Sequence, residues 1–209
     1  MNSKRSVFRR HAAVAAAGAA ALVLAACGGG GDSSAGHDGH TTASPSSTAA
    51  SASQGRHNAA DVAFAKGMIP HHRQAVRMAD LAHGRARSAQ TTKLAEDIKK
   101  AQGPEIETLS GWLTSWGEEV PAEGAMDHSM HDTGGMMTTA EMDELQKASG
   151  KAFDTAFMEM MIKHHEGAVS MAKTEQADGS YAPAKKMAGQ IISSQTAEID
   201  KMNELLGRN

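Results

Sequence analysis

Two pairs of adjacent histidines, each with a methionine one helical turn before it, are the residues best suited to chemistry in this sequence. On a helix, residues three and four apart share a face, so each methionine sulfur can reach the patch formed by its histidine pair. Thioether and imidazole together suit copper, and thioether favours the cuprous ion. The sequence therefore predicts copper ligands at Met68, His71, His72, Met161, His164 and His165.

A second interpretation of the histidines needs no metal. A buried histidine can be satisfied by polar side chains on a neighbouring helix, and an unsatisfied buried polar group costs about 1–3 kcal/mol. Polar residues do fall on the predicted buried face of the later helices, at Gln102, Glu105, Gln195 and Glu198. The sequence leaves open whether the histidines bind metal or belong to a buried hydrogen-bond network.

The segment 117–138 carries a second group of candidate ligands, Met126, His128, Met130 and His131, followed by Met136 and Met137. Loops longer than about 12–15 residues are uncommon and often functional. Little of this segment is apolar, so we expect its methionines to be ligands and not core residues. The alternative is a solvated linker. If the segment does bind metal, its methionines would offer sulfur to the cuprous ion and its histidines would offer imidazole to the cupric ion.

The two histidine pairs occupy equivalent places in a tandem duplication. A shift of 93 residues lays segment 64–72 over 157–165, and the same offset lays 98–113 over 191–206. Within each copy, the apolar residues and one histidine recur at spacings of four and three, which is the pattern of one helical seam. No alternating strand pattern is present. We therefore expect two helices in each copy.

Two tandem helical hairpins can bury their apolar seams only against each other. The predicted fold is therefore all-α, an antiparallel four-helix bundle with pseudo-twofold symmetry. Gly84 and Gly179 fall where a helix commonly ends with a left-handed residue. Thr138 and Glu141 have the spacing of a capping box, which predicts a helix that starts there and breaks near Gly150.

The repeated motif carries a resemblance to a known family. Phe-x3-Met-Ile-x-His-His-x2-Ala-Val-x-Met-Ala, followed by Gln-x2-Glu-Ile, resembles the domain of unknown function 305 over roughly residues 58–207. The resemblance implies a ferritin-like four-helix fold and, for some members, copper binding linked to copper tolerance. By motif position, it also implies that the six helical methionines and histidines are the candidate ligands.

The N-terminal segment 1–27 has the features of a bacterial lipoprotein signal peptide. Positive residues precede an apolar stretch, 12–26, that is too short to span a bilayer permanently. Leu24-Ala25-Ala26 then leads into Cys27, which we expect to be acylated. Residues 28–57 are rich in Gly, Ser, Thr and Ala, and are predicted to form a disordered tether. The protein is thus expected to be exported and lipid-anchored to the cell membrane, facing the periplasm or the cell exterior.

The remaining chain, 58–209, is the predicted duplicated domain, with repeat 1 at about 58–116, the Met/His loop at 117–138 and repeat 2 at about 139–207. Cys27 is the sole cysteine, which excludes a disulfide and, in the domain, a thiolate site. Removing the signal leaves 17 Lys and Arg against 24 Asp and Glu, a formal charge of −7. This acidic balance argues against a nucleic-acid partner and suits a protein that attracts cations.

These observations favour a copper-binding protein of the cell envelope that sequesters or hands over copper. Its expected partners are the membrane, through the lipid, and copper-transport or efflux proteins. The alternatives are a metal-free scaffold or adaptor and a ferritin-like metal oxidase. Di-iron oxidases place Glu three residues before His, whereas Met68 and Met161 stand there in this chain, so we expect no enzyme. Since imidazole binds metal only when unprotonated, copper affinity is expected to fall as the pH drops through about 6.5.

Overall fold

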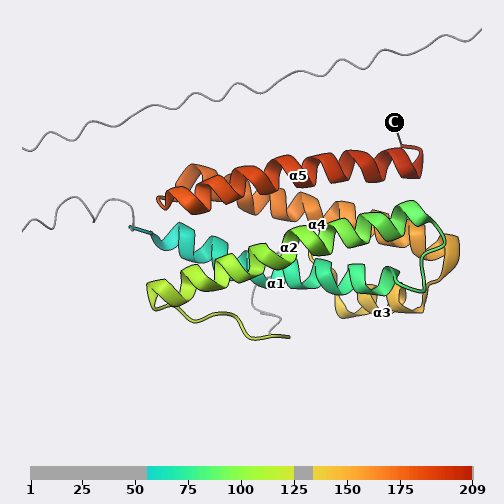
Figure 1. Ribbon diagram of the computed structural model, residues 1–209, viewed down its shortest axis with the longest axis horizontal. Helices are drawn as coiled ribbons and strands as arrows, with labels where there is room; N and C mark the ends of the chain where they lie inside the picture. The colour runs from blue at the N-terminus through green and yellow to red at the C-terminus, as the bar shows by residue number, and fades with distance from the viewer. Residues whose placement is uncertain (1–55, 125–133, 209) are drawn as a thin grey trace, which may run out of the picture. The chain divides into compact units, whose positions relative to one another are not determined.

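The computed structural model of the protein describes residues 56–124 and 134–208. They form five helices (Figure 1): α1 Ala59–Ala82, α2 Ala89–Trp116, α3 Thr139–Lys147, α4 Gly150–Asp178 and α5 Ala182–Leu206. The four long helices pack as two hairpins, α1 with α2 and α4 with α5, and the hairpins meet through α1 and α4. The predicted all-α bundle is confirmed. The short helix α3, which lies against α1 and α4, is a fifth element that the four-helix prediction did not count separately.

Local signals explain most of the helix ends. Thr138 and Glu141 form the predicted capping box at the start of α3, and the chain breaks as expected before Gly150, whose φ is +62°. Gly84 ends α1 with a left-handed φ of +80°. The same prediction is wrong for Gly179, which has an extended conformation with a φ of −67°. Space favours glycine there, because a Cβ would lie 2.7 Å from the backbone oxygen of Glu175.

Two apolar clusters fill the bundle, one toward each end. The first includes Ala75 and Met78 of α1 and Phe157 of α4, and the second includes Phe64 of α1 and Ala168 of α4. Each long helix passes from one cluster to the other through polar residues. The bundle therefore has a buried polar layer between its two apolar halves, made of His71, His72, Gln102, His164, His165 and Gln195.

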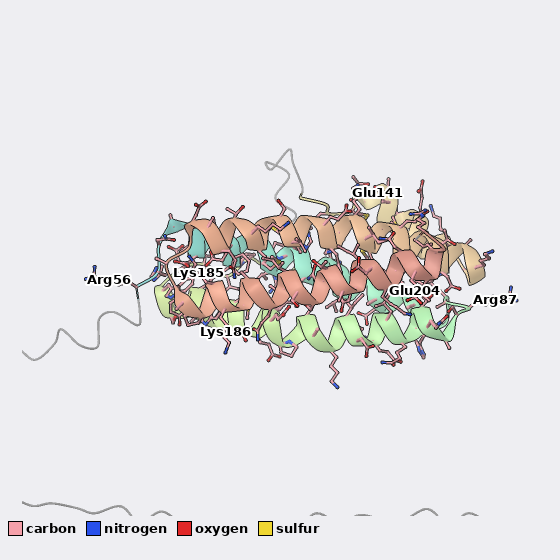
Figure 2. The ribbon with its side chains drawn as sticks, turned by 90° about the horizontal axis from the view of Figure 1, so that it is seen from above. Arg56, Arg87, Glu141, Lys185, Lys186 and Glu204 are labelled. Atoms are coloured by element: carbon pink, nitrogen blue, oxygen red, sulfur yellow. The ribbon has the colours of Figure 1, made fainter. Side chains whose placement is uncertain are left out.

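Figure 2 shows the bundle with its ends marked by charged residues: Lys185 and Lys186 lie toward one end, and Arg87 and Glu204 lie toward the other. None of the helices in the described ranges, 56–124 and 134–208, is long and apolar enough to cross a membrane.

Candidate metal centre

The four helical histidines meet in the polar layer, at the contact between α1 and α4. Each has at most 1% of its surface exposed. The rings of His71 and His164 are in contact, with centroids 3.7 Å apart and planes tilted by 43°. His72 and His165, the next residue on each helix, contact Glu105 of α2 and Glu198 of α5. The duplicated motif thus brings its two copies together at one place.

The outer histidines, His72 and His165, have glutamate partners. His165 Nε2 lies 2.6 Å from Glu198 Oε2 in a hydrogen bond. His72 Nε2 lies 2.8 Å from Glu105 Oε2, but the two groups are not aligned for a hydrogen bond. A hydrogen bond between histidine and glutamate, one of the two interpretations of the sequence, is therefore present at His165, and at His72 there is a close contact without that alignment.

The central histidines, His71 and His164, have almost no partners. His71 Nε2 lies 3.0 Å from the carbonyl oxygen of Gly134. Among residues 56–124 and 134–208, no group partners His71 Nδ1 or either ring nitrogen of His164 with hydrogen-bond geometry, and all three atoms are buried. Burial lowers the pKa of His71 to about 3. Burial and the neighbouring histidines also lower the pKa of His164, and the nearby backbone of His71 opposes this only weakly. Both rings are thus neutral, with lone pairs available.

A short segment, residues 134–137, contacts His71 of α1 and packs against the backbone of α4, and we call it the strap. Gln74 holds it on α1: its Nε2 donates to the carbonyl of Met137 at 2.8 Å, and its Oε1 accepts from the Met137 N–H at 2.6 Å. On α4, a Cβ on Gly167 would lie 1.4 Å from the oxygen of Gly134, so only glycine fits there. The strap therefore packs closely on both histidine-bearing helices.

Sequence reasoning missed the strap, although one signal was present. Gln74 and Gly167 occupy the same position of the two copies, 93 residues apart, and are chemically unlike. The expectation that the linker methionines do not belong to the core is also wrong for Met137, which has 2% of its surface exposed and joins the first apolar cluster. It does so because the strap carries it onto α1. Met136 is half-buried.

The two helical methionines lie on opposite sides of the polar layer. Met68 belongs to the second apolar cluster and Met161 to the first, and both are fully buried. Each thioether lies one turn before its own histidine pair. Because α1 and α4 run in opposite directions, the two thioethers therefore lie on opposite sides of the polar layer. The remaining predicted ligands, Met126, His128, Met130 and His131, lie outside the described residues, as does Cys27.

The donors in the layer suit a soft ion better than a hard one. Within 56–124 and 134–208, no group of three or more His, Asp or Glu side chains is arranged to hold a metal ion. What the fold brings together is a pair of neutral imidazoles with unpartnered nitrogens, with a thioether on either side. Imidazole and thioether are ligands for copper, whereas calcium and magnesium require oxygen ligands. The residues present therefore fit copper as a bound cargo.

Comparison with known proteins identifies the family. The model of the family described as "Domain of unknown function (DUF305)" matches residues 61–206. The chain belongs to DUF305. No curated protein matches the sequence.

Several solved structures of this family are similar to the chain. A DUF305 protein of Streptomyces coelicolor, described as a candidate secreted protein, is 33% identical, with a TM-score of 0.64 over 71% of this chain and 92% of that one. CopM in its Cu(II)-bound form is 34% identical, with a TM-score of 0.61 over 69% of this chain and 94% of that one. A DUF305 fragment of Deinococcus radiodurans is 28% identical, with a TM-score of 0.64 over 73% and 98%. CopM has also been solved with Cu(I) and with silver bound.

Proposed function

We propose that this DUF305 protein binds copper in the cell envelope and sequesters it or hands it over, which would serve copper tolerance. One observation carries the proposal: the central pair of His71 and His164 is fully buried, neutral and largely unpartnered. Buried nitrogens without partners are costly, at about 1–3 kcal/mol each, so a bound ion would offset a cost that the fold otherwise bears. The similarity to CopM, solved with copper and silver, supports copper as that ion.

The proposed ligands are the two central imidazoles, supported by the outer histidines and the flanking thioethers. Soft thioether ligands favour the cuprous ion, so the buried site is proposed to hold Cu(I) more tightly than Cu(II). The residues proposed for the bundle site are Met68, His71, His72, Met161, His164 and His165. Met126, His128, Met130 and His131 are proposed as a separate, weaker set in the linker, and a copper-transport or efflux protein as the partner.

The test is a titration of Cu(I) and Cu(II), separately, into the wild type and two variants. His71→Leu/His164→Leu removes both central imidazoles and should abolish the tightest site. Gln102→Leu is the matched control, because Gln102 is a buried residue of the same layer whose side-chain oxygen is also unpartnered. It should bind copper like the wild type. If the folded double variant keeps wild-type affinity, the proposed site is wrong.

A metal-free scaffold is the second candidate function. The hydrogen bond between Glu198 and His165 favours it, because this bond satisfies part of the polar layer without an ion. Elemental analysis of the protein as isolated from copper-grown cells distinguishes the two. Copper in the wild type that is absent from the double variant supports the first function, and a metal-free wild type that binds no added copper supports the scaffold.

Attachment to the membrane is proposed through an acylated Cys27, preceded by a signal peptide. The pattern of the first 27 residues supports it, and so does the description of the Streptomyces coelicolor relative as a candidate secreted protein. Replacing Cys27 with Ser should move the protein from the membrane fraction to the soluble fraction of the cell or the medium. A wild-type protein that is already soluble in cells contradicts the lipoprotein assignment.

A further inference from the structure

One ring nitrogen is unpartnered in all four histidines of the polar layer, and it is always Nδ1. The opposite nitrogen, Nε2, faces a protein oxygen in three of the four. His71 Nε2 meets the carbonyl of Gly134 at 3.0 Å, and His165 and His72 Nε2 meet Glu198 and Glu105 at 2.6 and 2.8 Å. In both copies of the motif, therefore, Nε2 of the outer histidine faces a protein oxygen and Nδ1 is left without a partner among the described residues.

A neutral imidazole carries its proton on one nitrogen and a lone pair on the other. An oxygen acceptor beside Nε2 favours the tautomer with the proton there, which leaves the Nδ1 lone pair free. Metal-binding histidines are commonly oriented in this way, with a carboxylate or carbonyl on the nitrogen that does not touch the metal. Such an acceptor also makes the ligating nitrogen more basic.

We propose that Glu105 and Glu198 are positioning residues for the copper site, holding His72 and His165 as Nε2–H tautomers so that their Nδ1 atoms face the bound ion. The inference rests on the proposed function for its metal, but its claim about protons concerns the metal-free protein. The carbonyl of Gly134 in the strap does the same for His71.

The placement of the two glutamates supports this role. They occupy equivalent positions of the two copies, 93 residues apart, on α2 and α5. Their side chains are 23% and 21% exposed, so the carboxylates keep access to water while their histidines are fully buried. Among the described residues, neither glutamate takes part in any other ion pair. Each carboxylate thus connects a buried imidazole ring to the surface.

The two pairs differ in a way that sharpens the inference. The Glu198 contact is an aligned hydrogen bond, whereas the Glu105 contact is not aligned. His165 should therefore be held in a single tautomer, and His72 should populate the Nε2–H form less completely.

The experiment uses the full chain labelled with ¹⁵N in histidine, without metal. Two-bond ¹⁵N–¹H correlation spectra should show His165 as the Nε2–H tautomer in the wild type and in Glu198→Gln, whose amide oxygen can still accept. In Glu198→Ala the tautomer should become mixed. Glu118→Ala, which removes a surface carboxylate paired with Lys66, is the control and should leave the ring signals unchanged. A wild-type His165 protonated on Nδ1 overturns the proposal.

A parallel titration with Cu(I) tests the consequence for binding. Loss of an outer hydrogen-bond partner typically costs about 10–100-fold in metal affinity, so Glu198→Ala should weaken binding by that factor and Glu198→Gln by less. Equal affinity in Glu198→Ala and the wild type overturns the positioning role. A wild type that binds no copper instead overturns the proposed function, and the spectra of the metal-free protein then still decide whether the glutamates set the tautomers.

Discussion

Asp61 and Asp154 stand at the same position of the two copies, and each accepts hydrogen bonds from the turn of the opposite hairpin. Asp154 on α4 accepts from the backbone N–H groups of Arg87 and Ser88, both at 3.1 Å. Asp61 on α1 accepts from the N–H of Tyr181 at 2.9 Å. Each hairpin is thereby tied to the turn of the other. The two contacts lock α1 against α4, which is the interface that holds the central histidines.

The first prediction concerns this reciprocal contact. Asp154→Ala removes the acceptor of two N–H groups at the turn before α2, so it should lower the free energy of unfolding by about 1–3 kcal/mol. Asp97→Ala is the control, because Asp97 forms an exposed ion pair with Lys93 one turn away, and such pairs contribute about 0.3–0.5 kcal/mol. Urea unfolding of the metal-free protein measures both. Equal losses in the two variants would contradict the role given to Asp154.

The second prediction is a pH dependence that comes from Glu175. This residue of α4 is 1% exposed, and within the part of the chain that the structure describes its carboxyl group has no partner other than the nearby carboxylate of Asp61. Burial, together with the nearby carboxylate of Asp61, raises the pKa of Glu175 from its usual 4.5 to about 8. The folded protein therefore keeps a proton that the unfolded chain releases near pH 4.5, so stability should fall as the pH rises from about 4.5 to 8.

Thermal unfolding of the metal-free protein between pH 5 and 9 measures this slope. Glu175→Gln keeps the shape of the side chain but cannot ionise, so its unfolding temperature should depend less on pH over the same range. Glu141→Gln is the control. The backbone N–H of Thr138 lowers the pKa of the Glu141 carboxyl, so this variant should keep the wild-type slope between pH 5 and 9. An identical slope in the wild type and Glu175→Gln would show that Glu175 is not the titrating group.

The third prediction concerns the strap. A Cβ on Gly167 would overlap the carbonyl of Gly134 at 1.4 Å, so Gly167→Ala should displace the strap and cost about 1–3 kcal/mol, as overpacking does. Gly111→Ala lies within α2, where a Cβ meets nothing within 4 Å, and should leave stability unchanged or raise it by up to about 1 kcal/mol. Amide hydrogen exchange at Met137 should also accelerate in Gly167→Ala. If the amide of Met137 exchanges at the wild-type rate in Gly167→Ala, the strap tolerates the methyl group.

The fourth prediction separates a ligand from a structural histidine. Both nitrogens of His164 are buried and find no partner among the residues that the structure describes, so His164→Leu should not destabilise the metal-free protein. His165→Leu, in contrast, leaves Glu198 without its partner and should cost about 1–3 kcal/mol. Chemical unfolding of the two metal-free variants gives the comparison. If His164→Leu is destabilised as much as His165→Leu, then His164 serves the fold and not a cargo.

The sequence was sufficient to predict the fold, because the duplication carries one helical seam twice. Phe64, Met68 and His71 share this seam with their counterparts, so the meeting of His71 with His164 follows from packing two copies together. The seam pattern does not predict the rotation of each helix about its own axis. That rotation decides that the glutamates contact His72 and His165 and leave the central pair alone.

Two other features depend on long-range contacts that no local pattern records. The strap reaches Gln74 across 63 residues of chain, and no rule of turns or helices predicts that contact. The expected loss of copper affinity near pH 6.5 assumed an ordinary imidazole. Burial lowers the pKa of His71 to about 3, so competition from protons at this ring begins only in much stronger acid.

The strap requires different residues at one equivalent position of the two repeats. The linker needs an amide side chain at position 74 and no side chain at the equivalent position 167, although the histidines on either side of it are duplicated. A recombination event that made the halves identical would place glutamine against the backbone of Gly134, or glycine where Met137 is held. The divergence of the copies at this position is therefore a requirement of joining them in one chain, separate from any requirement of the metal.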